Sequence, residues 1–163
     1  MSLFAHFRIG DTAFVYHSIV QRQRLMPKPR PYTRQVKQLM ADKSRLVLKA
    51  EAFDAMALSE TAQPLWASAA ACEERIAPLL DILGRESEAA LHRISAAACY
   101  ERSGEASRAA NLYRAALAGP LTDAARKDVH KRLSACLKKL QRDSAASVAY
   151  SLAMGQILPK TAS

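Results

Sequence analysis

The chain of 163 residues is long enough for one domain with a core that needs no disulfides or metals, and it holds 32 alanines and 19 leucines against 6 valines, 6 isoleucines and 5 threonines. Because strands are built from the β-branched residues that are scarce here, this composition excludes an all-β sandwich or barrel and disfavours a doubly wound sheet. The formal net charge is +9, with basic ends (residues 1–49 and 122–163) around an acidic middle. Such asymmetry favours an acidic partner: a protein, an anionic lipid surface or nucleic acid.

Residues 1–26 are predicted to form a separate apolar arm. Three of the four phenylalanines lie in its first fourteen positions. Asp11 can cap a helix over about residues 12–25, and a short hairpin is the alternative. Residues 27–32 then alternate proline with basic residues, which predicts an extended linker without helix. We interpret this linker as a stiff connector, with a recognition peptide as the alternative.

Residues 33–158 are predicted to form a helical domain. A long amphipathic helix is expected over about residues 33–57, followed by a break at residues 59–61. The next helix is expected to start near Pro64 and to be kinked or ended by Pro78. Further helices are predicted over residues 86–102, 106–118, 122–142 and 144–154. The chain as a whole is therefore expected to contain about six or seven helices, and its short turns require neighbouring helices to pack antiparallel.

The cysteines and the hydropathy pattern indicate a cytoplasmic protein. Cys72, Cys99 and Cys136 are odd in number, lack CxxC spacing and each follow an alanine. We expect buried thiols in a reduced setting. No stretch approaches the roughly 18 apolar residues of a membrane-spanning helix, and the N-terminus does not resemble a secretion signal.

An internal repeat emerges when residues 94–116 are shifted by 37 positions. The shift pairs Cys99 with Cys136 and Tyr113 with Tyr150. Three alanine pairs coincide in the same register, namely Ala98 with Ala135, Ala109 with Ala146, and Ala116 with Ala153.

The segment 100–117 resembles a tetratricopeptide repeat (TPR). That family has an aromatic residue late in its first helix, a glycine at the turn, and an alanine, an aromatic and an alanine in its second helix. The matching residues here are Tyr100, Gly104, Ala109, Tyr113 and Ala116. Residues 90–118 match well and residues 127–155 in part, although the spacing of 37 departs from the family's usual 34. A more distant unit is expected over residues 48–77, with Leu58, Ala67 and Ala71 in the key places. Another helical array or a plain bundle is the alternative.

The resemblance implies an antiparallel array of helix pairs, an α-α superhelix that binds protein segments in a groove lined by the first helices. The groove positions that the resemblance carries over to this sequence are Ile94, Ala98 and Ala135 together with the polar candidates Glu101, Arg102, Lys131, Lys138 and Lys139. Lys131 stands where some family members use a lysine to grip a C-terminal carboxylate, but Ala135 replaces their asparagine. The resemblance thus implies a basic groove for an acidic or extended segment, in an adaptor or scaffold. The arm is expected to cap the array, or to reach into a second copy and form a homodimer.

Little in the sequence indicates catalysis, a cofactor or a metal. The four histidines have no metal-ligand spacing, and no phosphate loop or nucleophile elbow is present. Glu88 and His92, four positions apart, are interpreted as an exposed helix pair rather than an acid–base couple. We therefore expect no enzyme. Nucleic-acid binding is the alternative function, because several cations are spaced to share one helix face: Arg126, Lys127, Lys131, Lys138 and Arg142.

Overall fold

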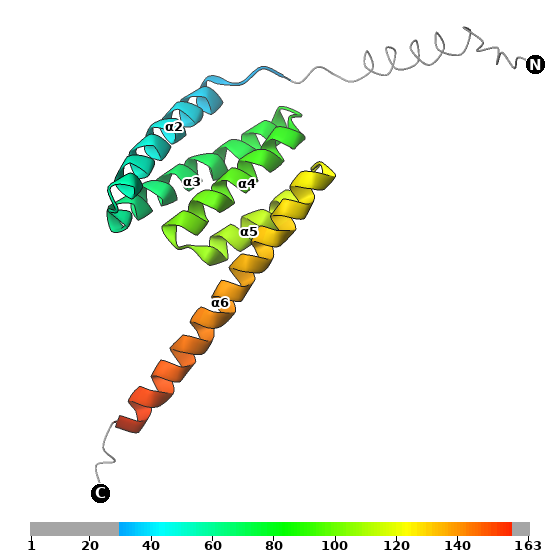
Figure 1. Cartoon of the computed structure of the whole chain (residues 1–163). Coiled ribbons are helices and arrows are strands. Elements are labelled where there is room, and N and C mark those ends of the chain that lie inside the picture. The colour runs from blue at the N-terminus through cyan, green and yellow to red at the C-terminus, as the bar shows by residue number, and fades with distance from the viewer. Residues whose placement is uncertain (1–29, 158–163) are drawn as a thin grey trace, which may run out of the picture. The chain divides into compact units, whose positions relative to one another are not determined.

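The computed structural model describes residues 30–157, and this part of the chain is helical without any strand (Figure 1). Its five helices are α2 Arg34–Ala55, α3 Ser59–Ile82, α4 Glu86–Ser103, α5 Ala106–Leu117 and α6 Asp123–Ile157. The all-α class is confirmed, with five helices in the described range where six or seven were expected for the chain. The chain divides into two units, Met1–Arg30 and Pro31–Ser163, and these helices belong to the second. The arm predicted over residues 1–26 lies outside the described residues.

Several helix ends follow directly from the sequence. Thr33 precedes α2, and its hydroxyl accepts a hydrogen bond of 3.2 Å from the backbone N–H of Val36. Gly104 ends α4 with a left-handed φ of 89°. Thr122 precedes α6 and caps it, because its hydroxyl accepts a hydrogen bond of 3.3 Å from the backbone N–H of Ala125. The predicted boundaries of α2, α4 and α5 are confirmed to within one or two residues.

A break does separate α2 from α3, but it lies at residues 56–58 and not at 59–61 as predicted, and α3 begins at Ser59 rather than near Pro64 and does not end at Pro78. A proline inside a helix lacks an N–H and leaves the carbonyl four residues earlier without its usual partner. Both prolines are exposed, so water can bond the freed carbonyl. The helix therefore tolerates both prolines without ending.

The predicted break between residues 142 and 144 is also wrong, since α6 is one helix of 35 residues. Neither glycine nor proline occurs at that point, and the alanines that follow favour helix. Residues 127–155 consequently do not form a helix pair. Tyr150 is 67% exposed and Ala146 is exposed, whereas Tyr113 and Ala109, their expected counterparts, are fully buried.

The two helix pairs α2–α3 and α4–α5 correspond to each other at a different spacing, 47 positions. Their turns contain left-handed residues at Ala57, with φ 59°, and at Gly104, with φ 89°. The buried Ala62, Trp66 and Ala69 of α3 match the buried Ala109, Tyr113 and Ala116 of α5.

The register expected for residues 48–77 is therefore wrong. Leu58 is 47% exposed, and Ala67 and Ala71 are only partly buried. In a chain so rich in alanine, small residues alone fit many registers, and the turn signal was hidden because Ala57 stands where the second pair has a glycine.

Each helix packs against the next one along the chain. One core cluster surrounds Trp66, Tyr100 and Tyr113, and a second lies around Val36 and Leu80. Most other core residues are alanines, which let the helices approach closely while the aromatic rings fill the remaining space. Through Val129 and Cys136, which are both buried, the first half of α6 completes the first cluster.

Candidate interaction surface

A polar cluster around Asp54 joins α2, α3 and α4. The Asp54 carboxylate, near the end of α2, accepts a hydrogen bond of 2.8 Å from Nε1 of Trp66. It also pairs with Nη2 of Arg102 at 3.2 Å. The Arg102 guanidinium lies over the Trp66 ring, 3.8 Å from its centroid. The arginine is thus held by charge and by its contact with the ring.

An equivalent cluster around Glu101 joins α4, α5 and α6. The Glu101 carboxylate accepts hydrogen bonds from the Tyr113 hydroxyl at 2.7 Å and the Cys136 thiol at 3.1 Å, and it pairs with Arg132 at 3.4 Å. Burial, followed by donation to Glu101, raises the pKa of Tyr113, so its hydroxyl keeps the proton that it donates. In both clusters the aromatic residue follows the acid by twelve positions and the arginine comes from the next helix pair or from α6.

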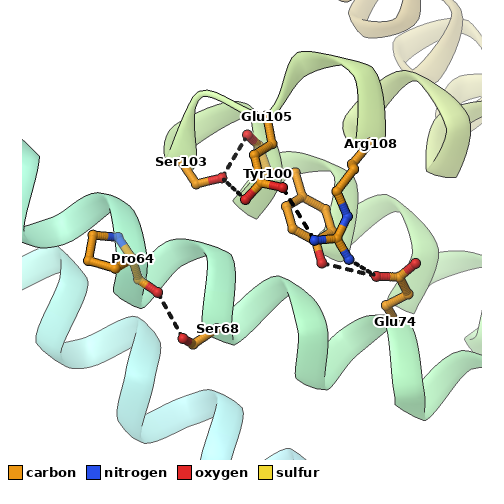
Figure 2. A network of polar contacts seen from close by, with 7 residues as sticks. All are labelled: Pro64, Ser68, Glu74, Tyr100, Ser103, Glu105 and Arg108. Atoms are coloured by element: carbon orange, nitrogen blue, oxygen red, sulfur yellow. Dashed lines mark hydrogen bonds and ion pairs between the residues drawn. The ribbon is translucent and has the colours of Figure 1, made fainter.

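A third cluster joins α3, α4 and α5, and Figure 2 shows it from close by. Glu74 accepts from the Tyr100 hydroxyl at 3.0 Å and pairs with Arg108 at 2.9 Å, while the Arg108 guanidinium lies 4.1 Å from the centroid of the Tyr100 ring. Burial first, and then the bond to Glu74, raises the pKa of Tyr100 to about 12. Arg108 also pairs with Glu105, beside the turn between α4 and α5.

Glu73 is a charged side chain in the interior, only 1% exposed. Its carboxylate contacts Nδ1 of His92, accepts from the Ser95 hydroxyl at 2.7 Å and pairs with Lys43 at 3.2 Å. Burial alone would raise the pKa of Glu73, but the hydrogen bonds and the charges of His92 and Lys43 outweigh it and lower the pKa. Because Ser95 donates to Glu73 and not to His92, these side chains do not form a nucleophile–base–acid relay.

The pair predicted between Glu88 and His92 does not form a hydrogen bond or ion pair. His92 contacts Glu73 on α3 instead, and Glu88 binds the Tyr32 hydroxyl and Arg85. The Tyr32 hydrogen bond is the largest of the effects that lower the pKa of Glu88. Sequence spacing within one helix could not show that a neighbouring helix offers each side chain a better partner.

The cysteines are free thiols, as expected, and two of the three are buried. Burial raises the pKa of Cys99 to about 11. Burial and the hydrogen bond to Glu101 raise the pKa of Cys136 to about 12. Cys72 is only partly buried, and burial raises its pKa as well. Within residues 30–157 no group of three or more potential ligands could hold a metal ion.

The five polar residues carried over from the TPR groove differ in their surroundings. Glu101 and Arg102 already have partners in the clusters described above. Lys131, Lys138 and Lys139 are exposed on α6, and none of them forms an ion pair with an acidic group of the described residues. The available cations of the expected site are therefore those of α6.

One side of α6 presents a continuous exposed strip, which we call the outer face of α6. Helix periodicity, with steps of three, four or seven positions, places its members on one side. They are the exposed residues Lys127, Lys131, Lys138, Arg142, Ala145, Val148, Ala149 and Leu152. A hollow of about 570 Å³ lies beside this strip, with Ala135, Lys138, Gln141, Arg142 and Ala145 among its lining residues. The sequence had indicated the cations of this face but not its apolar continuation.

The second half of α6 extends past the other helices (Figure 1). In the first half of α6, one side of the helix carries the leucines that pack on the first core cluster, Leu133, Leu137 and Leu140. In the second half, the same side of the helix carries serines instead: Ser144, Ser147 and Ser151. From Gln141 to Leu152 every residue is exposed. Residues 141–152 therefore expose the whole circumference of the helix.

Comparison of the chain with known protein families, curated proteins and solved structures finds no match. Among the helices described here, none combines the length and the apolar character needed to cross a membrane.

Proposed function

We propose that this protein is a non-enzymatic interaction module, an adaptor or scaffold built on a TPR-like array of helix pairs. It binds an acidic or extended segment of a partner protein along α6. The equivalence of the Asp54 and Glu101 clusters supports an array in which each pair is tied to the next by the same kind of contact. The matching buried positions of α3 and α5 support it as well.

The observation that carries the proposed function is the contrast between paired acids and unpaired cations. Asp54, Glu73, Glu74, Asp81 and Glu101 each pair with a basic side chain of another helix. The exposed lysines and arginines of α6 without an ion pair in the described part of the chain are Lys127, Lys131, Lys138, Lys139 and Arg142. Arg126 has no ion pair either, but it is partly buried and donates to the backbone carbonyls of Leu117 and Gly119. An acidic partner can thus bind α6 without displacing an internal contact, and its acids would complement the surface charge.

The test is an affinity pull-down with the tagged full chain and two triple variants of equal net charge. One variant reverses the charge of three lysines on α6: Lys131→Glu, Lys138→Glu and Lys139→Glu. The matched control reverses exposed residues of α2: Arg34→Glu, Lys37→Glu and Lys49→Glu. We expect the wild type and the control to recover the same discrete protein, and the α6 variant to lose it.

Two results would contradict this function. Recovery of the same protein by the α6 variant would show that these lysines do not form the contact. Binding that polynucleotide blocks, that disappears between about 50 and 200 mM salt, and that both triple variants weaken equally would establish the nucleic-acid alternative.

A further inference from the structure

From Ser144 onward, α6 combines exposed apolar side chains with an absence of charge. Val148 is 57%, Tyr150 67%, Leu152 64% and Met154 47% exposed, all within seven positions. No charged residue occurs from Ser144 to Pro159 in the sequence. Several large apolar side chains exposed on one short segment mark an interaction site more often than single scattered ones do.

The apolar residues on the outer side are ordered as in helices that recognise another helix. Ala145, Val148, Ala149 and Leu152 follow the steps i, i+3, i+4 and i+7, which align them along one side. They continue the same strip that carries Lys131, Lys138 and Arg142. From Lys131 to Leu152 the strip is about 30 Å long at 1.5 Å per residue, the length of a helix of about twenty residues.

The charge of α6 argues against a second copy of this chain as the occupant. This helix carries seven lysines and arginines against three aspartates. Two such helices side by side would repel each other. The order of the strip also argues against a membrane, because a helix lying flat in a bilayer interface sorts charged and apolar residues onto opposite sides. On α6 they share one side and are sorted along the axis.

We infer that the outer face of α6 is a bipartite site for an amphipathic helix of a partner protein. The acidic half of that helix lies against Lys131, Lys138 and Arg142, and its apolar half lies against Ala145, Val148, Ala149 and Leu152. This inference rests on the proposed function and adds the chemical class of the segment bound: a helix with acidic and apolar residues in separate halves.

The test is selection from a displayed library of random peptides about twenty residues long, with the purified full chain as bait. We expect enrichment of peptides that have Asp or Glu in one half and large apolar residues at helical spacing in the other. The matched control bait carries Arg34→Glu and Lys37→Glu, and it is expected to select the same peptides.

A representative selected peptide is then synthesised, and its affinity is measured for the wild type and for three variants. Lys138→Glu with Arg142→Glu tests the basic half of the site. Ala149→Arg places a charge in the apolar half while keeping a residue that favours helix. We expect each of these changes to lower the affinity for the peptide by at least about tenfold, and we expect the α2 control to leave the affinity unchanged. Circular dichroism of each variant checks that the helices remain.

The outcomes separate this inference from the proposed function. Selected peptides that are acidic throughout and bind the Ala149→Arg protein normally would overturn the bipartite site and leave the function standing. Selection of no peptide, or of peptides indifferent to Lys138→Glu with Arg142→Glu, would overturn both. Tight binding to phosphatidylserine vesicles that Lys138→Glu with Arg142→Glu abolishes, without any selected peptide, would assign the strip to a membrane and overturn the inference.

Discussion

Asp54 and Glu101 occupy equivalent places near the ends of α2 and α4, and each carboxylate joins three helices through one aromatic donor and one arginine. Because each arginine comes from the following helix pair or from α6, the contact links one unit to the next as well as the two helices within a unit. The partly buried acid satisfies several donors at once, and such networks are worth more than isolated surface pairs.

Replacing Glu101 with glutamine should destabilise the protein. The Glu101→Gln variant keeps the shape of the side chain but removes the charge that holds Arg132, and it replaces one of the two oxygens that accept from the Tyr113 hydroxyl and the Cys136 thiol with an NH2 donor. We expect a loss of about 1–3 kcal/mol in the free energy of unfolding, measured by urea denaturation. The control, Glu60→Gln at an exposed position, should change it by less than about 0.5 kcal/mol. Equal effects of the two substitutions would contradict the role assigned to Glu101.

The turns of the two helix pairs should respond in opposite ways to exchanging alanine and glycine. Ala57 has a left-handed φ of 59°, which is costly for a residue with a Cβ, and Gly104 has φ 89° with no atom within 4 Å of an added Cβ. We expect Ala57→Gly to raise the free energy of unfolding by up to about 1 kcal/mol and Gly104→Ala to lower it by about 1 kcal/mol. Thermal or urea unfolding measures both, and a stabilising Gly104→Ala would contradict the turn geometry.

Lowering the pH should reduce the free energy of unfolding, in part because Glu73 becomes protonated. Its folded pKa lies below the value in the unfolded chain, so the unfolded state takes up a proton first as the pH falls. The stability that ionised Glu73 contributes is therefore complete above the unfolded pKa of about 4.3 and is lost as the pH falls through the folded pKa. The Glu73→Gln variant should show a shallower loss of stability than the wild type below about pH 4.3, in urea denaturation at a series of pH values. Parallel curves for the two proteins would contradict the lowered pKa.

The cysteines should react with alkylating reagents in the order of their exposure. Buried Cys99 and Cys136 have pKa values raised to about 11 and about 12, so they contain almost no thiolate at neutral pH. Partly buried Cys72 should be alkylated by iodoacetamide before the other two, and denaturant should equalise all three. Mass spectrometry of the labelled peptides measures the order. Rapid labelling of Cys136 in the native protein would show that the contact between α4 and α6 opens readily.

The sequence supported the fold class and several helix boundaries because those depend on local chemistry. Alanine and leucine favour helix, Thr33 and Thr122 cap, and Gly104 ends α4. The continuity of α3 could not be predicted from the sequence. A helix can continue through a proline when water can bond the backbone carbonyl four residues earlier, and the sequence does not show whether that carbonyl is exposed. The spacing of 47 positions between the two helix pairs could not be predicted either, because Ala57 adopts a left-handed turn conformation that is unusual for alanine.

The candidate site was predicted only in part. Lys131, Lys138 and Lys139 are exposed cations on α6. The contacts of Glu101 and Arg102 were not foreseen, because their partners lie between 12 and 48 positions away and only the packed structure brings them together. The sequence predicts a buried second unit where the structure has the apolar half of the outer face, since a run of small and apolar residues has the same pattern on a core helix and on an unpartnered one.

Site-specific photo-cross-linking tests most directly whether α6 is the interaction surface. A photoreactive amino acid is placed singly at Lys131, at Ala149 or, as the control, at Lys37 on α2, and the nuclease-treated complexes are irradiated and identified by mass spectrometry. The account predicts cross-links to one and the same protein segment from positions 131 and 149, and none to it from position 37. Cross-links from position 37 to that protein as strong as those from α6, or none from either α6 position, would contradict it.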